Sequence, residues 1–242
     1  MGTIFRLTLR QLASRRRLAI IVLLAALPIG LALLLNFFLA DEEDFSEEFV
    51  NTIIDGMMIS LVMPIIVLTL ATAAFGNEVD DRTLNMLVLK PVSRFSIVLP
   101  KLLGSITVAA PLIVAATVAV SLIALADGGM RAAAAAGAAL LVGVVAYASV
   151  FTWAGLLTTH ALGFGLVYVF LWEGLVMSLL PGVRYLSIRG YTLGTLYGLD
   201  EVTFRSIGED AIELPAALVG AGVAAVGFFL LTLWRLKRMD VP

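Results

Sequence analysis

The chain has 242 residues, of which 61% are hydrophobic and 14% are charged, with a mean hydropathy of +1.04. Soluble domains have about 45–50% apolar and about 25% charged residues, so this composition indicates an integral membrane protein. The net charge of −2 leaves no basic footprint for nucleic acid, and the lack of cysteine and a single histidine exclude disulfides, thiol chemistry and multi-histidine metal sites.

Residues 1–17 are basic, with apolar side chains on one helical face and arginines on the other. This pattern predicts an interfacial helix at a membrane surface. The apolar run 18–39 follows and predicts the first membrane span. A cleaved signal peptide is the alternative, but the run is longer than a signal core and no clear cleavage site follows it.

Only acidic charges lie in the loop that follows, namely Asp41, Glu42, Glu43, Asp44, Glu47, Glu48 and Asp55. We predict that this loop faces outward as solvated surface, with calcium binding as the alternative. The next apolar run, 57–75, predicts the second span and returns the chain to the first side of the membrane.

A charged amphipathic insert, 77–101, separates the second apolar run from the third. Asn77 is a candidate helix cap followed by acidic residues, so we predict a helix that starts near Glu78 and runs for about three turns. Ser93 is a candidate second cap, and Pro100 is predicted to break the chain again. The pattern predicts two short helical pieces along the membrane surface, with a solvated loop as the alternative.

The remaining apolar runs predict four further spans, at 102–126, 132–157, 161–180 and 213–234. Small residues in the fourth span, among them Gly137 and Gly143, favour close helix packing, within the chain or across a dimer. His160 lies at the turn before the fifth span and is interpreted as a polar turn residue.

Basic residues are concentrated on one predicted side of the membrane. That side holds Arg6, Arg10, Arg15, Arg16, Arg17, Arg82, Lys90, Arg94, Lys101, Arg235, Lys237 and Arg238; the other holds Arg131, Arg184, Arg189 and Arg205. Because cytoplasmic loops are enriched in Lys and Arg, both termini are predicted to be cytoplasmic. We therefore predict an all-α integral membrane protein, a single domain of residues 1–242 with six transmembrane helices, in the inner (plasma) membrane.

Glu173 is the only charged residue in the interior of the predicted spans; Glu213 is the first residue of the sixth. A charge inside the bilayer is costly and usually faces a bundle interior or a wet cavity. Glu173 is thus a candidate pathway-lining carboxylate, or a partner for a basic residue of segment 181–212 such as Arg184. A structural glutamate that is protonated or hydrogen-bonded is the alternative. Its neighbour Trp172 is a second pathway candidate, as a cavity wall or an interfacial anchor.

The insert 77–101 resembles the cytoplasmic loop of ATP-binding-cassette (ABC) type-2 export permeases. The matching residues are Glu78, Arg82, Thr83, Leu84, Leu87, Lys90, Pro91, Val92, Ser93, Arg94 and Lys101. One departure is Arg82, which stands where family members often have glycine before Thr-Leu. In the family this segment is a coupling helix that contacts the separate ATPase subunit.

The resemblance implies that the chain is a transmembrane permease subunit of an exporter, paired with a second permease chain and two ATPase subunits. It implies contacts with the ATPase at Glu78, Asp81, Arg82, Leu84, Leu87, Lys90 and Arg94, and a pathway opened by the first, second and fifth spans. It also implies that segment 181–212, which is long for a connector, holds short or re-entrant helices over an outer exit. An exposed loop is the alternative.

The sequence has no G-x-x-x-x-G-K-[ST] phosphate-binding loop and no G-x-S-x-G or H-E-x-x-H motif. We predict no catalytic residues and no metal site, and expect ATP and magnesium to bind a partner ATPase. Two other functions stay open. An ion-driven secondary transporter is disfavoured by the single intramembrane carboxylate, whereas a membrane scaffold or sensor that docks a cytoplasmic partner would use the same insert.

Overall fold

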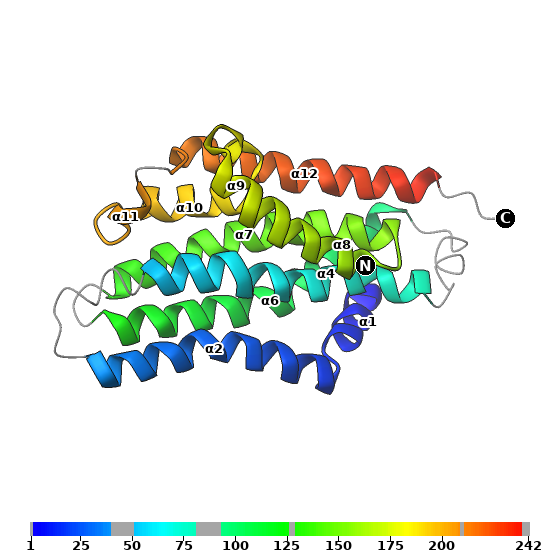
Figure 1. Ribbon diagram of the computed structural model, residues 1–242. Helices are drawn as coiled ribbons and strands as arrows, with labels where there is room; N and C mark the ends of the chain where they lie inside the picture. The colour runs from blue at the N-terminus through cyan, green and yellow to red at the C-terminus, as the bar shows by residue number, and fades with distance from the viewer. Residues whose placement is uncertain (1, 40–50, 81–92, 126–128, 209–210, 239–242) are drawn as a thin grey trace.

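The computed structural model describes residues 2–39, 51–80, 93–125, 129–208 and 211–238, and these residues form helices joined by short turns, with no strand among them. Figure 1 shows the long helices running side by side, with α1 (Gly2–Leu12) lying across one end of the bundle. The ends of both described termini, α1 and the last turn of α12 (Leu214–Arg238), lie at this same end. The predicted all-helical class is therefore confirmed for these residues.

Five helices are long and apolar enough to cross a membrane, by length and composition. They are α2 (Arg15–Leu39), the continuous pair η1 (Thr52–Val62) and α4 (Met63–Asp80), α6 (Phe95–Ala124), α7 (Gly129–Leu157) and α12. These five correspond to predicted spans one to four and six. The chain is thus a multi-pass membrane protein.

The predicted fifth span, 161–180, is shorter and composite. It consists of α8 (Ala161–Val167), a π-helical stretch η2 (Tyr168–Val176) and a single turn, α9 (Met177–Leu179). A 3₁₀ turn, η3 (Pro181–Leu186), then leads into α10 (Ile188–Leu199) and the short α11 (Arg205–Gly208). The predicted outer segment is therefore helical over much of its length.

Helix α7 occupies the centre of the bundle, where it packs against α4, α6, α10 and α12. Its small residues permit this close packing. A Cβ atom on Gly155 would lie 2.5 Å from the backbone oxygen of Thr72, and one on Gly143 would lie 2.6 Å from Oγ1 of Thr192. The small residues of the fourth span thus serve packing within the chain.

The N-terminal helices begin and end differently from the prediction. The basic residues Arg15, Arg16 and Arg17 form the first turn of α2 instead of the last turn of an interfacial helix. The break between the two helices lies at Ala13 and Ser14, because serine is favoured at the position just before a helix. Helix α1 is amphipathic as predicted, with Thr8 and Leu12 buried.

The amphipathic insert also differs from the prediction. Helix α4 continues through Asn77 to Asp80, so the predicted helix start near Glu78 is wrong; the second apolar run extends as one helix without a break. The predicted cap at Ser93 is confirmed, since its Oγ accepts a hydrogen bond from the backbone N–H of Ser96 at 3.2 Å. Helix α6 then runs through Pro100, so the predicted break there is wrong. Proline is tolerated in membrane helices because neighbouring groups satisfy the freed backbone.

Candidate functional site

The described part of the insert lies at the end of the bundle that carries both termini. Of the predicted coupling residues, Glu78 and Arg94 are described, at the end of α4 and just before α6. The other predicted coupling residues, Asp81, Arg82, Leu84, Leu87 and Lys90, lie outside the described residues. The structure therefore describes the two helices that flank the centre of the insert.

These two helices are joined by a buried ion pair. Lys101 of α6 is only 2% exposed, and its Nζ lies 2.6 Å from Oε1 of Glu78. Its Nζ also donates to the backbone oxygen of Ala74 and lies 4.7 Å from the centre of the Phe75 ring. The last turns of α4 are thereby held to the first turns of α6. Lys101 belongs to the motif that carries the family resemblance, but the sequence offers no sign that its side chain is buried against Glu78.

A small hydrophobic cluster packs beside this ion pair. It contains Phe75 of α4, Ile97 and Val98 of α6, Leu156 of α7 and Leu236 of α12, with Ile4 of α1 packed against it. Five helices therefore meet at this end of the bundle, and the base of the insert is part of a packed structure.

The second candidate site surrounds Glu173, in η2, which is 2% exposed. Its carboxylate accepts hydrogen bonds from the Tyr168 hydroxyl at 2.7 Å and from the Ser187 hydroxyl. It also accepts bonds from the backbone N–H groups of Ile188, at 3.0 Å, and Arg189, at 3.4 Å. Segment 181–212 thus supplies donors to Glu173, from the Ser187 hydroxyl and from the first turn of α10. These donors are a hydroxyl and backbone N–H groups and not the basic side chain that was predicted, so the contacts correspond to the hydrogen-bonded alternative.

The guanidinium of Arg189 pairs with a different carboxylate. Its Nη2 lies 2.7 and 2.9 Å from the two Asp55 oxygens, and its Nε lies 3.2 Å from Asp55 Oδ1. Asp55 is in the first turn of η1, so its predicted place in the acidic loop is wrong, and Glu173 is not the only charged residue within a span. The helix includes Asp55 because apolar residues flank it and Arg189 compensates its charge.

Both carboxylates lie in π-helical stretches. In η1 the Ser60 hydroxyl donates to the backbone oxygen of Asp55, and in η2 the Tyr168 hydroxyl donates to Glu173; each pair is five residues apart. The two stretches contact each other. π-Helical geometry is rare, and where it occurs, mostly as single-turn bulges within α-helices, it is frequently at functional sites. Periodicity in the sequence does not reveal them, because a π-helix uses the same apolar residues as an α-helix.

Trp172 lies beside Glu173 and makes a related contact. Its indole N–H donates to the backbone oxygen of Leu186 at 3.2 Å, immediately before α10. Two consecutive residues of η2 therefore hold the chain that enters α10. His160 lies in an exposed turn, where its Nδ1 is 3.0 Å from the Thr159 hydroxyl oxygen.

Helix α10 is seated deeply between α7 and α12. A Cβ on Gly194 would lie 2.4 Å from the backbone oxygen of Ile212, and one on Gly220 would lie 2.3 Å from the Tyr191 ring. Thr192 and Leu196 are fully buried. The predicted alternative of an exposed loop is therefore wrong for α10, because glycines on both sides allow the helix to sink into the bundle.

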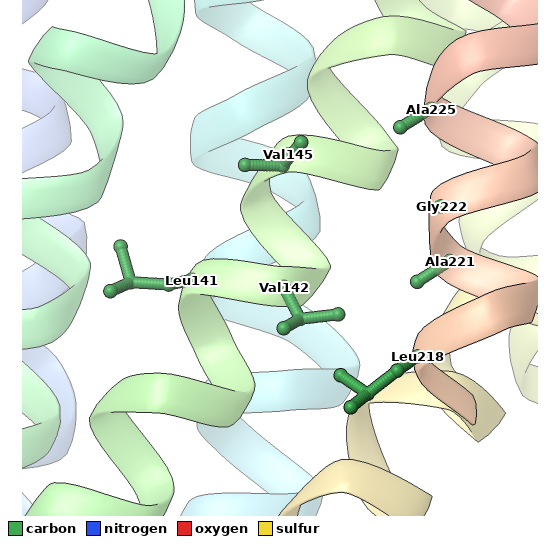
Figure 2. A pocket seen from close by; sticks show the side chains of 7 residues that line it. All are labelled: Leu141, Val142, Val145, Leu218, Ala221, Gly222 and Ala225. Carbon is green, nitrogen blue, oxygen red and sulfur yellow. The ribbon is translucent and has the colours of Figure 1, made fainter. Parts of the chain in front are cut away.

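An apolar groove of about 320 Å³ lies between α7 and α12. Figure 2 shows the side chains that line it: Leu141, Val142 and Val145 from α7, and Leu218, Ala221, Gly222 and Ala225 from α12. The lining has no polar side chain, so the groove offers shape and hydrocarbon contact only. No group of three or more His, Asp or Glu side chains that could hold a metal ion occurs within the described ranges.

A comparison with protein families finds a match over residues 13–187, to a family described as ABC-2 family transporter protein. The matched range covers most of the chain, from the turn between α1 and α2 to Ser187 at the start of α10. It includes the buried ion pair of Lys101 and both Asp55 and Glu173. No curated protein matches the chain.

Proposed function

This chain belongs to the ABC-2 family of transporter proteins, and from that premise we propose that it is the permease subunit of an ATP-driven exporter. Membership makes it a membrane component of an ABC transporter, a class in which the permease works with ABC ATPase subunits. We propose that two permease chains, identical or similar, form the substrate pathway with two ATPase subunits. ATP and magnesium would bind the ATPases, since the sequence has no phosphate-binding loop.

The proposed topology has six spans with both termini in the cytoplasm. The composite helix from α8 to α9 would be the fifth crossing, completed toward the outer side by α10. The concentration of arginine and lysine in α1, the start of α2, the insert and the end of α12 supports this orientation. Location in the inner (plasma) membrane follows from it as part of the proposal.

The observation that carries the coupling proposal is the Glu78–Lys101 ion pair. If an ATPase displaces the insert, the membrane helices move with it only if the insert is firmly attached to them. The ion pair ties α4 to α6 on both sides of residues 81–92, so displacement of this segment would move both helices together. We propose that closure of the ATPases is transmitted in this way.

The structure weakens the sequence argument against an ion-driven transporter, which was that only one ionisable residue lies within the spans. Asp55 and Arg189 join Glu173 as ionisable residues among the helices, so the count of such groups no longer separates the two functions. The family assignment and the expected ATPase partner now separate them. Identification of the partner is therefore the decisive experiment.

We would test the proposal by native mass spectrometry of the tagged chain, extracted in mild detergent from its own host. Two permease chains with two ATPase subunits are the expected complex, which releases its ATPases only under harsher activation. A complex that reproducibly lacks any nucleotide-binding chain would contradict the proposal and favour a scaffold or an ion-driven transporter.

Combined charge reversal in the insert, Asp81→Lys with Arg82→Glu, is expected to weaken binding of the ATPase about tenfold. Opposed charges at a docking surface select the partner, and reversing both leaves the net charge unchanged. The measurement is a titration of the purified ATPase against the permease in nanodiscs.

The matched control reverses two exposed charges near α11, Glu201→Lys with Arg205→Glu. This control should bind the ATPase as the wild type does, since α11 lies at the opposite end of the bundle from α1 (Figure 1). Equal affinity of both double variants would rule out a role for Asp81 and Arg82 in docking.

A further inference from the structure

The first turn of α10 is held by two carboxylates from two different helices. Glu173 of η2 binds the backbone N–H groups of Ile188 and Arg189, and Asp55 of η1 binds the Arg189 side chain. Both attachments therefore act on the same turn. The predicted second and fifth spans meet at this point, since η1 and η2 contact each other.

The Glu173 attachment has the character of a helix cap supplied by another segment. The four partners of Glu173 described above are all donors: two hydroxyls and two backbone N–H groups. An ionised carboxylate accepts such a set without conflict, and the positive end of the α10 dipole favours its negative charge. Ser187 strengthens the turn further, because its Oγ accepts from the backbone N–H of Gly190 at 2.8 Å.

The Asp55 attachment is a two-oxygen ion pair. The planar guanidinium of Arg189 matches the carboxylate, an arrangement that adds geometric specificity to the charge attraction. Both side chains are 26% exposed, so the rest of the protein leaves the pair partly uncovered, in contrast to the buried Glu173. The two attachments therefore differ in accessibility as well as in origin.

Asp55 also lies on the helical rod that ends at the insert. The stretch Thr52–Val62 continues directly into Met63–Asp80, so Asp55 stands near one end of this rod and Glu78 near the other. A movement imposed on the Glu78 end reaches Asp55 through continuous helix. The movement of Asp55 is then passed to α10 through Arg189. Glu173 meanwhile binds the first turn of α10 to η2.

We propose that Asp55, Arg189 and Glu173 form a two-point latch on α10 that passes movement of the Thr52–Asp80 rod to the far end of the bundle. The three are positioning residues: they fix α10 and make its place depend on the relation between the second and fifth spans. The second half of this proposal rests on the proposed exporter function, because an ATPase must supply the movement.

The latch is tested with a single cysteine at a buried position of α10. The natural chain has no cysteine, so Thr192→Cys gives one reactive site at a side chain that is fully buried. The rate of labelling by a water-soluble maleimide in nanodiscs then reports how often α10 leaves its seat. In Thr192→Cys with Asp55, Arg189 and Glu173 unchanged, the cysteine is expected to be labelled slowly.

Adding Glu173→Gln is expected to speed labelling about tenfold, because one amide oxygen cannot satisfy the donors that the carboxylate accepts. Asp55→Asn should also speed labelling, and the exchange of Asp55→Arg with Arg189→Asp should restore part of the slow rate.

Tyr168→Phe is the matched control: it removes a Glu173 bond that comes from the same helix and not from α10. Unchanged labelling in Glu173→Gln and Asp55→Asn, or an equal rise in Tyr168→Phe, would overturn the latch.

Transmission is tested in the complex with the ATPase. Magnesium and ATP are expected to change the labelling rate with the latch intact, and this change should be lost with Asp55→Asn. Transmission through the latch would be refuted if ATP still changed the labelling rate in Asp55→Asn. It would also be refuted if ATP did not change the labelling rate of the complex with an intact latch although that complex hydrolyses ATP. Failure of the exporter function itself shows separately, as a purified complex without an ATPase, and the labelling without ATP still decides whether the latch exists.

Discussion

Glu78→Met is expected to destabilise the protein by about 3–5 kcal/mol, because it leaves the Lys101 ammonium buried without its carboxylate. The Ala74 backbone oxygen and the Phe75 ring remain beside the ammonium, but neither carries a negative charge. For a chain of this length such a loss lowers the melting temperature by about 10 °C. Thermal unfolding of the purified protein in detergent, followed by tryptophan fluorescence, measures it.

The reverse substitution, Lys101→Met, is expected to cost only about 1–2 kcal/mol. It leaves Glu78, whose side chain is 17% exposed and is nearer to water than that of Lys101. The double variant should be no less stable than Lys101→Met alone, because it removes both charges and keeps apolar side chains of similar length. If Glu78→Met and Lys101→Met cost the same, the ammonium is not an uncompensated buried charge.

Gly155→Ala is expected to cost about 1–3 kcal/mol, and Gly155→Leu to prevent the bundle from forming. The added Cβ would lie 2.5 Å from the Thr72 backbone oxygen and 2.9 Å from its Cα. These are backbone atoms that no rotamer change can move, so α4 and α7 would have to separate. Melting temperature and the yield of monodisperse protein measure the effect.

Gly163→Ala is the control for this substitution. Gly163 lies in α8, and apart from its chain neighbours and the backbone of its own helix no atom lies within 4 Å of the added Cβ. Alanine favours a helix over glycine by about 1 kcal/mol, so this variant should be as stable as the wild type or more so. Equal losses in Gly155→Ala and Gly163→Ala would show that the cost comes from the helix itself and not from the contact with Thr72.

The long apolar runs were predictable because hydropathy alone identifies segments that cross a membrane. Their ends were not, because a helix continues wherever the neighbouring structure supports it. Asn77 and Pro100 carry local signals for a start and a break, but α4 and α6 run through both positions. Asp55 carries a signal for a loop, but Arg189 allows it to lie in a helix.

The candidate sites were predictable only in part. Glu173 is recognisable as a charge in an apolar run, but the basic side chain expected from segment 181–212 is replaced by hydroxyl and backbone N–H donors from that segment. That these partners are backbone N–H groups follows from where α10 begins, which no residue pattern indicates. Lys101 and Glu78 each appear as ordinary charges of a polar insert, and only folding brings them together.

The separation of the Asp55–Arg189 pair along the chain has a consequence for synthesis. The partners are 134 residues apart, so at about 5–20 residues per second Asp55 is made roughly ten seconds before Arg189. The second span must enter the membrane while its aspartate is still unpaired, carried by the apolar residues that follow. The bundle can complete its assembly only after the first turn of α10 has been synthesised and can bind Asp55 and Glu173.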